Sequence, residues 1–129
     1  MIKNKIHYIL KQKIDEILSS EDFVILFDGK KIRNKNELFR FFKETIDLPD
    51  SDNWSSIIDW LTDLSWLKAD KYAFVFDNYN SFLADDLVSK ELFLEILKED
   101  VLPWWENDAK KYVVGGVAKS FQVYIIKND

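Results

Sequence analysis

Residues 22–29 read DFVILFDG, a short apolar run that stops at an Asp-Gly pair. An unbroken apolar run of this length predicts a strand covered on both faces, as in a parallel sheet, with a turn at Asp-Gly. Residues 71–80, KYAFVFDNYN, repeat the pattern, and residues 120–129, SFQVYIIKND, predict a terminal strand. The three runs therefore indicate a small parallel sheet.

Helical patterns separate these strands. Residues 34–48, 53–67 and 85–102 carry apolar side chains at helical spacing. Pro49 follows the first of these segments and Pro103 follows the last, in positions where proline commonly ends a helix. The sequence thus predicts two helices between the first two strands and one long helix before the third.

The N-terminal residues 2–18 also place isoleucine and leucine on one side at about 100° per residue, which predicts a further amphipathic helix. Strands separated by helices predict a parallel sheet with right-handed crossovers. We therefore expect one α/β domain over residues 1–129, in which helices pack on a small three-stranded parallel sheet. Residues 1–20 form an N-terminal helical extension in this prediction. Within residues 103–119, Gly115-Gly116 predicts a turn of a small hairpin.

The composition limits the classes of function. The chain has 129 residues and no cysteine, which excludes disulfides, thiolate zinc sites and thiol nucleophiles. Its 18 basic and 23 acidic residues give a net charge of −5, which disfavours direct nucleic-acid binding and suits a positively charged partner. Neither a signal peptide nor a membrane-spanning run is expected, so the sequence predicts a soluble cytoplasmic protein. No cofactor or metal is expected either.

Residues 53–67, NWSSIIDWLTDLSWL, place small polar and acidic side chains together on one side of a helix. At about 100° per residue, Asp59 lies near the middle of that side, opposite the apolar residues. No Lys or Arg occurs between residues 44 and 67, and Asp59 and Asp63 form a like-charged i, i+4 pair that slightly destabilises a helix. A solvated face is the simpler interpretation, but a surface with charge of one sign favours a basic partner.

Several motifs occur in a recognisable order: FDGKKIRNKNELFRFF at 27–42, LP at 48–49, DWLTDLSWL at 59–67, FVFDNYNSF at 74–82 and FLEILKED at 93–100. Together they resemble the barstar family, whose namesake is an intracellular inhibitor of an extracellular bacterial ribonuclease. The resemblance runs from about Phe23 to Ile126. It implies a three-stranded parallel α/β domain whose acidic helix and preceding loop plug the positive active-site cleft of a ribonuclease.

The resemblance also implies roles for particular residues. Asp59 matches the main inhibitory aspartate of the family, Thr62 matches the threonine beside it, and Glu99 aligns with a glutamate on the later helix. Ser55 stands where the family has a second acid, and Ile58 stands where it has a tryptophan. The loop DSD at 50–52 is about two residues shorter than usual and lacks the aromatic and glycine residues found there. These departures leave a partner other than a ribonuclease open.

We therefore expect a ribonuclease or toxin inhibitor, an immunity-type protein that acts by occlusion and is not an enzyme. A barstar-fold module with a different protein partner is the alternative. No nucleic acid or membrane is expected to bind directly. The residues expected to contact the partner are Asp59, Ser55, Thr62, Asp63, Asp50, Asp52, Asn53 and Glu99.

An enzyme is a further alternative, because Asp28 and Asp77 each follow phenylalanine at the end of a predicted strand. Two carboxylates at that edge could hold Mg²⁺ beside a phosphate. However, Asp-Gly and Asp-Asn are common turn pairs, and no glycine-rich phosphate loop accompanies them, which favours turns. His7 is the only histidine, and no nucleophile motif accompanies it in the sequence. Trp104-Trp105 are expected to pack on the core of the domain.

Overall fold

The computed structural model describes residues 3–48, 52–65, 67, 69–108 and 119–127. Its four strands form one parallel sheet, with spatial order β1-β4-β3-β2. The bounds are β1 Ile6–Leu10, β2 Phe23–Asp28, β3 Lys71–Asp77 and β4 Ser120–Lys127. The α/β class and the parallel sheet are confirmed, and the predicted strands at 22–29, 71–80 and 120–129 correspond to β2, β3 and β4. The predicted strand count of three is wrong, because β1 adds a fourth.

The N-terminal helical extension is also wrong. Residues 6–10 form β1, which pairs with β4 over Ile6↔Val123 to Leu10↔Lys127, and only a 3-10 turn, η1 Lys11–Lys13, and the short α1 Ile14–Ile17 follow it. Asn4 fixes the entry to β1: its amide donates to the carbonyl oxygens of Leu102 and Lys119 and accepts from the backbone N–H of Phe121. Isoleucine also suits a strand, so pairing with β4 overrides the helical spacing.

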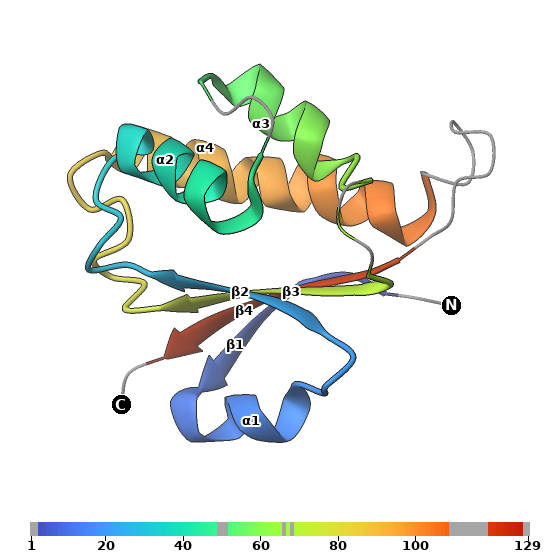
Figure 1. Ribbon diagram of the computed structural model, residues 1–129. Helices are drawn as coiled ribbons and strands as arrows, with labels where there is room; N and C mark the ends of the chain where they lie inside the picture. The colour runs from blue at the N-terminus through green and yellow to red at the C-terminus, as the bar shows by residue number, and fades with distance from the viewer. Residues whose placement is uncertain (1–2, 49–51, 66, 68, 109–118, 128–129) are drawn as a thin grey trace.

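Three helices cover one side of the sheet, and α1 lies on the other (Figure 1). They are α2 Lys35–Ile46, α3 Trp54–Leu61 and α4 Leu87–Ile96, and α4 is followed by two π-helical segments, η2 Leu97–Val101 and η3 Trp104–Asp108. The three predicted helices are thus confirmed, although α3 ends six residues before the predicted end at 67. Leu64 takes a left-handed backbone angle, φ 53°, which is incompatible with a continuing helix. Gly115-Gly116 lies outside the described residues.

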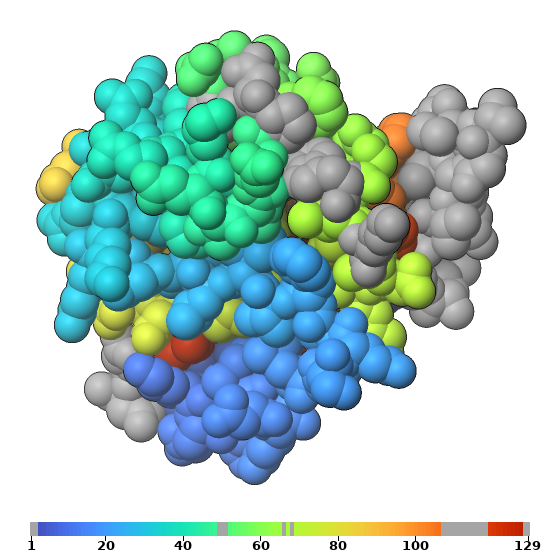
Figure 2. All heavy atoms as spheres, in the orientation of Figure 1, coloured from blue at the N-terminus to red at the C-terminus, as the bar shows by residue number. Residues whose placement is uncertain are grey.

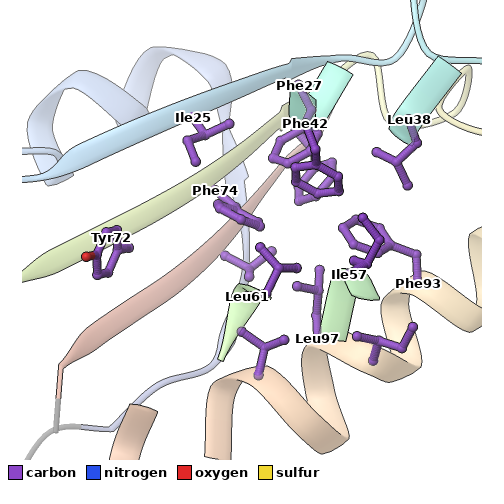
Figure 3. Close-up of a cluster of buried hydrophobic side chains, with 14 of the residues drawn as sticks. Ile25, Phe27, Leu38, Phe42, Ile57, Leu61, Tyr72, Phe74, Phe93 and Leu97 are labelled. Carbon is purple, nitrogen blue, oxygen red and sulfur yellow. The ribbon is translucent and has the colours of Figure 1, made fainter. Parts of the chain in front are cut away.

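The main core lies between the sheet and the three-helix layer. Phe27 of β2 is fully buried and stacks on Phe76 of β3 with ring centroids 4.3 Å apart. Figure 3 shows Phe27, Phe42 and Phe74 beside the buried residues of α3 and α4. Burial of this much aromatic and aliphatic surface is the main force that holds the helical layer in place. The labelled members are Ile25, Phe27, Leu38, Phe42, Ile57, Leu61, Tyr72, Phe74, Phe93 and Leu97.

The two sides of the sheet are not equally covered. Residues 72–76 of the central strand β3 are all buried, as an unbroken apolar run predicts. In β2, however, Val24 and Leu26 are 42% and 57% exposed while Ile25 and Phe27 are buried. The prediction of a strand covered on both faces is therefore wrong for β2, because this strand forms an edge of the sheet and α1 covers the second face farther in, over Ala73, Val75 and Tyr124.

Among the described residues, no helix is both long enough and apolar enough to cross a membrane.

Candidate functional site

The helix α3 is held rigidly by its apolar side. Ile57 and Leu61 are fully buried, and the Trp54 ring packs edge-on against Phe39 with centroids 5.0 Å apart. At the start of α3, the Asn53 side chain accepts a hydrogen bond from the backbone N–H of Ser56 at 2.9 Å. Such an N-cap satisfies one of the N–H groups that a helix start leaves free. The orientation of the opposite side of α3 is fixed as a consequence.

That opposite side continues just past the helix end as the acidic α3 face, which we define as Ser55 and Asp59 of α3 and Asp63, two residues beyond it. All three side chains are exposed, as the helical spacing predicts. The ion pairs found in the described parts of the chain join other residues: Lys11–Asp77, Lys13–Glu16, Arg33–Asp85 and Lys71–Glu21. The two carboxylates of the acidic α3 face therefore carry charge that no cation of the described chain neutralises by direct contact.

Two further predicted contact residues have structural roles at the ends of α3. The Thr62 hydroxyl donates to the carbonyl oxygen of Ile58 at 2.8 Å, and the carbonyl oxygen of Asp59 lies 3.2 Å away from the same hydroxyl. The Ile58 carbonyl also accepts the backbone N–H of Thr62, so the hydroxyl adds to the closure of the helix end at its C-cap residue. Asn53, the N-cap, is likewise committed to the backbone. Asn53 and Thr62 thus stand at the two ends of the helix that carries Ser55 and Asp59.

Glu99 lies on η2, the segment that packs against α3. Its side chain is exposed, while Leu97 and Val101 of the same segment are buried in the main core. The structure thus brings the η2 segment and α3 together, although their sequences are far apart. Asp52 is exposed just before α3, and Asp50 lies outside the described residues.

Trp60 is not among the residues predicted to contact the partner, but it lies beside them in α3. It is half-buried, packs on the main core and directly follows Asp59 in α3. Its place on the border of the polar arc was visible in the helical spacing, and tryptophan is enriched among residues that dominate protein interfaces. A partly exposed tryptophan beside an exposed carboxylate combines apolar area with charge.

Asp28 and Asp77 lie side by side, because β2 and β3 pair in register at these two residues. Their carboxylates are already engaged. Asp28 Oδ1 accepts hydrogen bonds from Asn78 Nδ2 at 2.9 Å and from the Lys30 backbone N–H at 3.1 Å, and Asp77 Oδ2 lies 3.1 Å from Lys11 Nζ. The hydrogen bond from Asn78, followed by that from Lys30, lowers the pKa of Asp28 below its ordinary value. The two hydrogen bonds to Asp28 hold the turns after the strands, and the ion pair joins Asp77 to η1.

Among the described residues, no group of three or more His, Asp or Glu side chains is arranged to hold a metal ion. His7 lies on β1, where its Nε2 is 2.8 Å from Gln122 Oε1 and its ring stacks on Tyr124. Trp105 is buried in the core, as expected, and Trp104 is half-buried against it. The described contacts of His7, Trp104 and Trp105 are therefore packing contacts and hydrogen bonds within the domain.

The fold and the acidic α3 face define a small parallel α/β domain that displays exposed carboxylates beside one helix. A model of the barstar family, described as barstar (barnase inhibitor), matches residues 23–115. The chain therefore belongs to the barstar family. Neither the curated proteins nor the solved structures compared with the chain gave a match. The family match begins at β2, so the edge strand β1 lies outside it.

Proposed function

We propose that this protein inhibits a basic ribonuclease or related toxin by covering its positively charged active-site cleft with the acidic α3 face. The observation that carries the proposal is Asp59: an exposed carboxylate without a direct cation partner in the described chain, on a helix whose other side is buried. Membership of a family of ribonuclease inhibitors supports the same interpretation. A nuclease cleft that binds phosphates presents the complementary charge.

The proposed mechanism is steric occlusion with charge complementarity and involves no chemical step. Close charge pairs in the complex that gives this family its name couple by about 1.5–7 kcal/mol, a range measured on that complex and not on this chain. A single well-placed aspartate can therefore dominate an interface. In the proposal, Asn53, Ser55, Thr62 and Asp63 along and beside α3 join Asp59 in the contact, together with Glu99 of η2 and with Asp50 and Asp52, which precede the helix.

The proposal places the protein in the cytoplasm of its host, as an immunity-type protein that meets its partner there. The alternative is a partner other than a ribonuclease. Ser55 replaces an acid of the family, Ile58 replaces a tryptophan, and the DSD loop at 50–52 is short, so part of the usual contact surface has changed. An enzyme that uses Asp28 and Asp77 is not proposed, because both carboxylates are engaged in turn hydrogen bonds and an ion pair.

The test measures cleavage of RNA by a basic microbial ribonuclease with increasing amounts of the wild-type chain, of Asp59→Ala and of Asp15→Ala. Asp15 is a matched control, since it is an exposed acid on α1, on the other side of the sheet. Asp59→Ala should weaken inhibition by about 100-fold or more, which corresponds to roughly 2.7 kcal/mol or more. Asp15→Ala should inhibit like the wild type.

Salt adds an independent readout. Association that depends on complementary charge slows steeply as salt is added, because exposed charges are screened over about 10 Å at 0.1 M. Equal inhibition by Asp59→Ala and wild type would contradict the role of Asp59. A wild-type chain that leaves several basic ribonucleases uninhibited would instead favour the alternative of another partner.

A further inference from the structure

A hollow of about 380 Å³ lies between the edge strand β1 and the π-helical segments η2 and η3. Its volume falls within the range of small-molecule sites in proteins. On the strand side, Ile6 packs on the main core, and Tyr8 lies on the same side of β1 because alternate residues of a strand share a side. Figure 2 shows the face on which α2 and α3 lie, and η2 and η3 reach the surface there only at the border.

Part of the lining of this hollow is apolar and incompletely covered. Tyr8 is 60% exposed, although Ile125, its partner in β4, is buried. Ile6 and Pro103 are half-buried beside it, and Leu102 is buried. An aromatic ring that lies largely uncovered beside aliphatic side chains offers apolar area to a ligand.

The helical side of the hollow departs from α-helical geometry. Lys98, Leu102 and Glu106 line it at intervals of four residues along η2 and η3. π-helical segments are rare, and they occur frequently at functional sites. Leu97 and Val101 of η2 are buried in the main core, so the backbone that carries Lys98 is held in place while the lysine side chain is exposed.

The charges around the hollow favour an anion. Lys5 and Lys98 are exposed on its two sides, and in the parts of the chain that the structure describes neither ammonium group has an ion pair or a hydrogen bond. Glu106 is the one carboxylate among the described lining residues, and its Oε1 already accepts from the backbone N–H of Asn4 at 2.8 Å. The hollow is therefore positive in a chain whose net charge is −5.

We propose that this hollow binds a small organic anion in which one carboxylate is joined to an aromatic or aliphatic body. The carboxylate lies between Lys5 and Lys98 in this arrangement. The apolar body covers the ring of Tyr8 and contacts Leu102 and Pro103. An inorganic anion would leave the apolar lining uncovered, and an amine would meet two ammonium groups of its own sign.

This site is separate from the features already described. The family model matches residues 23–115, so β1, and Tyr8 with it, lies outside the match. No residue of the acidic α3 face lines the hollow. The inference is therefore independent of the proposed function, and either can fail without the other.

Three probes of similar shape test the preference for an anion. Phenylpropionate, phenylpropanol and phenylpropylamine are anionic, neutral and cationic at neutral pH. Titration of the isotope-labelled full chain, followed through its amide chemical shifts, gives both the affinity and the location of binding. Phenylpropionate should bind about fivefold or more tighter than the alcohol, and the amine should bind most weakly. The shifts should concentrate in β1, η2 and η3.

Two variants with matched controls test the lining. Lys98→Glu should weaken the binding of phenylpropionate about fivefold or more, whereas Lys43→Glu, the same change of charge at an exposed position of α2, should stay within about twofold of the wild type. Tyr8→Ala should also weaken binding about fivefold or more, whereas Leu26→Ala, at an exposed apolar residue of the opposite edge strand, should not. Amide spectra without ligand check that each variant is folded.

Added salt gives a further readout. It should weaken the binding of phenylpropionate and leave that of the alcohol unchanged, since screening acts only on the charge. No binding of phenylpropionate at millimolar concentration, equal binding of the amine, or full affinity of a folded Lys98→Glu variant would each overturn the proposal. Shifts that fall on β2 or α3 instead of β1, η2 and η3 would overturn it as well.

Discussion

The indole Nε1 of Trp105 donates a hydrogen bond to the carbonyl oxygen of Leu61 at 2.8 Å, across 44 residues of sequence. Leu61 is the last residue of α3, and its carbonyl needs a donor from outside the helix. The bond is buried, so it fastens the end of the helix that carries Asp59 to the C-terminal helical segment. The presentation of the acidic α3 face therefore depends on a residue far from it in sequence.

Trp105→Phe should lower the free energy of unfolding by about 1–3 kcal/mol, because it leaves the buried carbonyl of Leu61 without its donor and removes part of a buried ring. Urea unfolding measures this change. Trp54→Phe is a matched control: it removes the same atoms from a half-buried ring whose described contacts are with other rings. An equal loss in the two variants would mean that the hydrogen bond itself contributes little.

The start of α3 offers a second test. Asn53→Ala removes the acceptor of the Ser56 N–H and should lower the free energy of unfolding by about 0.5–2 kcal/mol. Asn53→Asp keeps a good capping oxygen and should retain wild-type stability. Because α3 would fray in the alanine variant, its affinity for the partner should fall as well. Equal stability of the alanine and aspartate variants, measured by thermal unfolding, would contradict this role of Asn53.

The hydrogen bonds at the two ends of α3 show which features the sequence could predict and which it could not. The apolar face of α3 and the outward position of Asp59 followed from a repeat of about 3.6 residues, which depends only on local geometry. The bond from Trp105 to Leu61 depends on how distant elements pack, and no local pattern encodes it. The sheet shows the same division: β3 is correctly predicted as a buried strand, whereas β2 has a similar sequence but lies at the edge of the sheet, where it pairs with β3 alone among the described strands.

The N-terminal segment was misread for a related reason. Its isoleucines suit a helix by spacing and a strand by side-chain shape, and the decision comes from Asn4 and the free edge of β4. We expect Asn4→Ala to lower the free energy of unfolding by about 1–3 kcal/mol, because three described hydrogen bonds with backbone groups of Leu102, Lys119 and Phe121 are lost together. Hydrogen exchange should show faster exchange in β1 than in β3. Unchanged protection of β1 would contradict the assignment of this role to Asn4.

Asp86 predicts how stability depends on pH. It caps α4, and its pKa is lowered mainly by the hydrogen bond from the Ser89 hydroxyl at 2.7 Å, against a smaller opposing effect of burial. Because the folded pKa lies below the ordinary value of 3.8, Asp86 stabilises the fold above that pH, and this contribution is lost as the pH falls through the folded pKa. Ser89→Ala should therefore reduce stability at neutral pH and make its loss in acid shallower.

Asp86→Asn should act in the same direction, since it removes the titrating group and keeps a capping side chain. Unfolding by urea at a series of pH values between neutrality and the acid range measures both variants against the wild type. Curves for Ser89→Ala and wild type that stay parallel throughout the acid range would show that the Ser89 hydrogen bond does not set the titration of Asp86.

The acidic α3 face should favour binding at the expense of stability. Asp59 lies in the last turn of α3, where negative charge opposes the helix dipole, and Asp63 lies two residues beyond the end of the helix. Asp59→Asn should therefore raise the free energy of unfolding slightly, by about 0.3–1 kcal/mol at low salt, and the gain should shrink as salt is added. The same variant should bind the partner more weakly. If Asp59→Asn instead destabilised the free protein, Asp59 would have a structural role, and its effect on binding could no longer be assigned to direct contact.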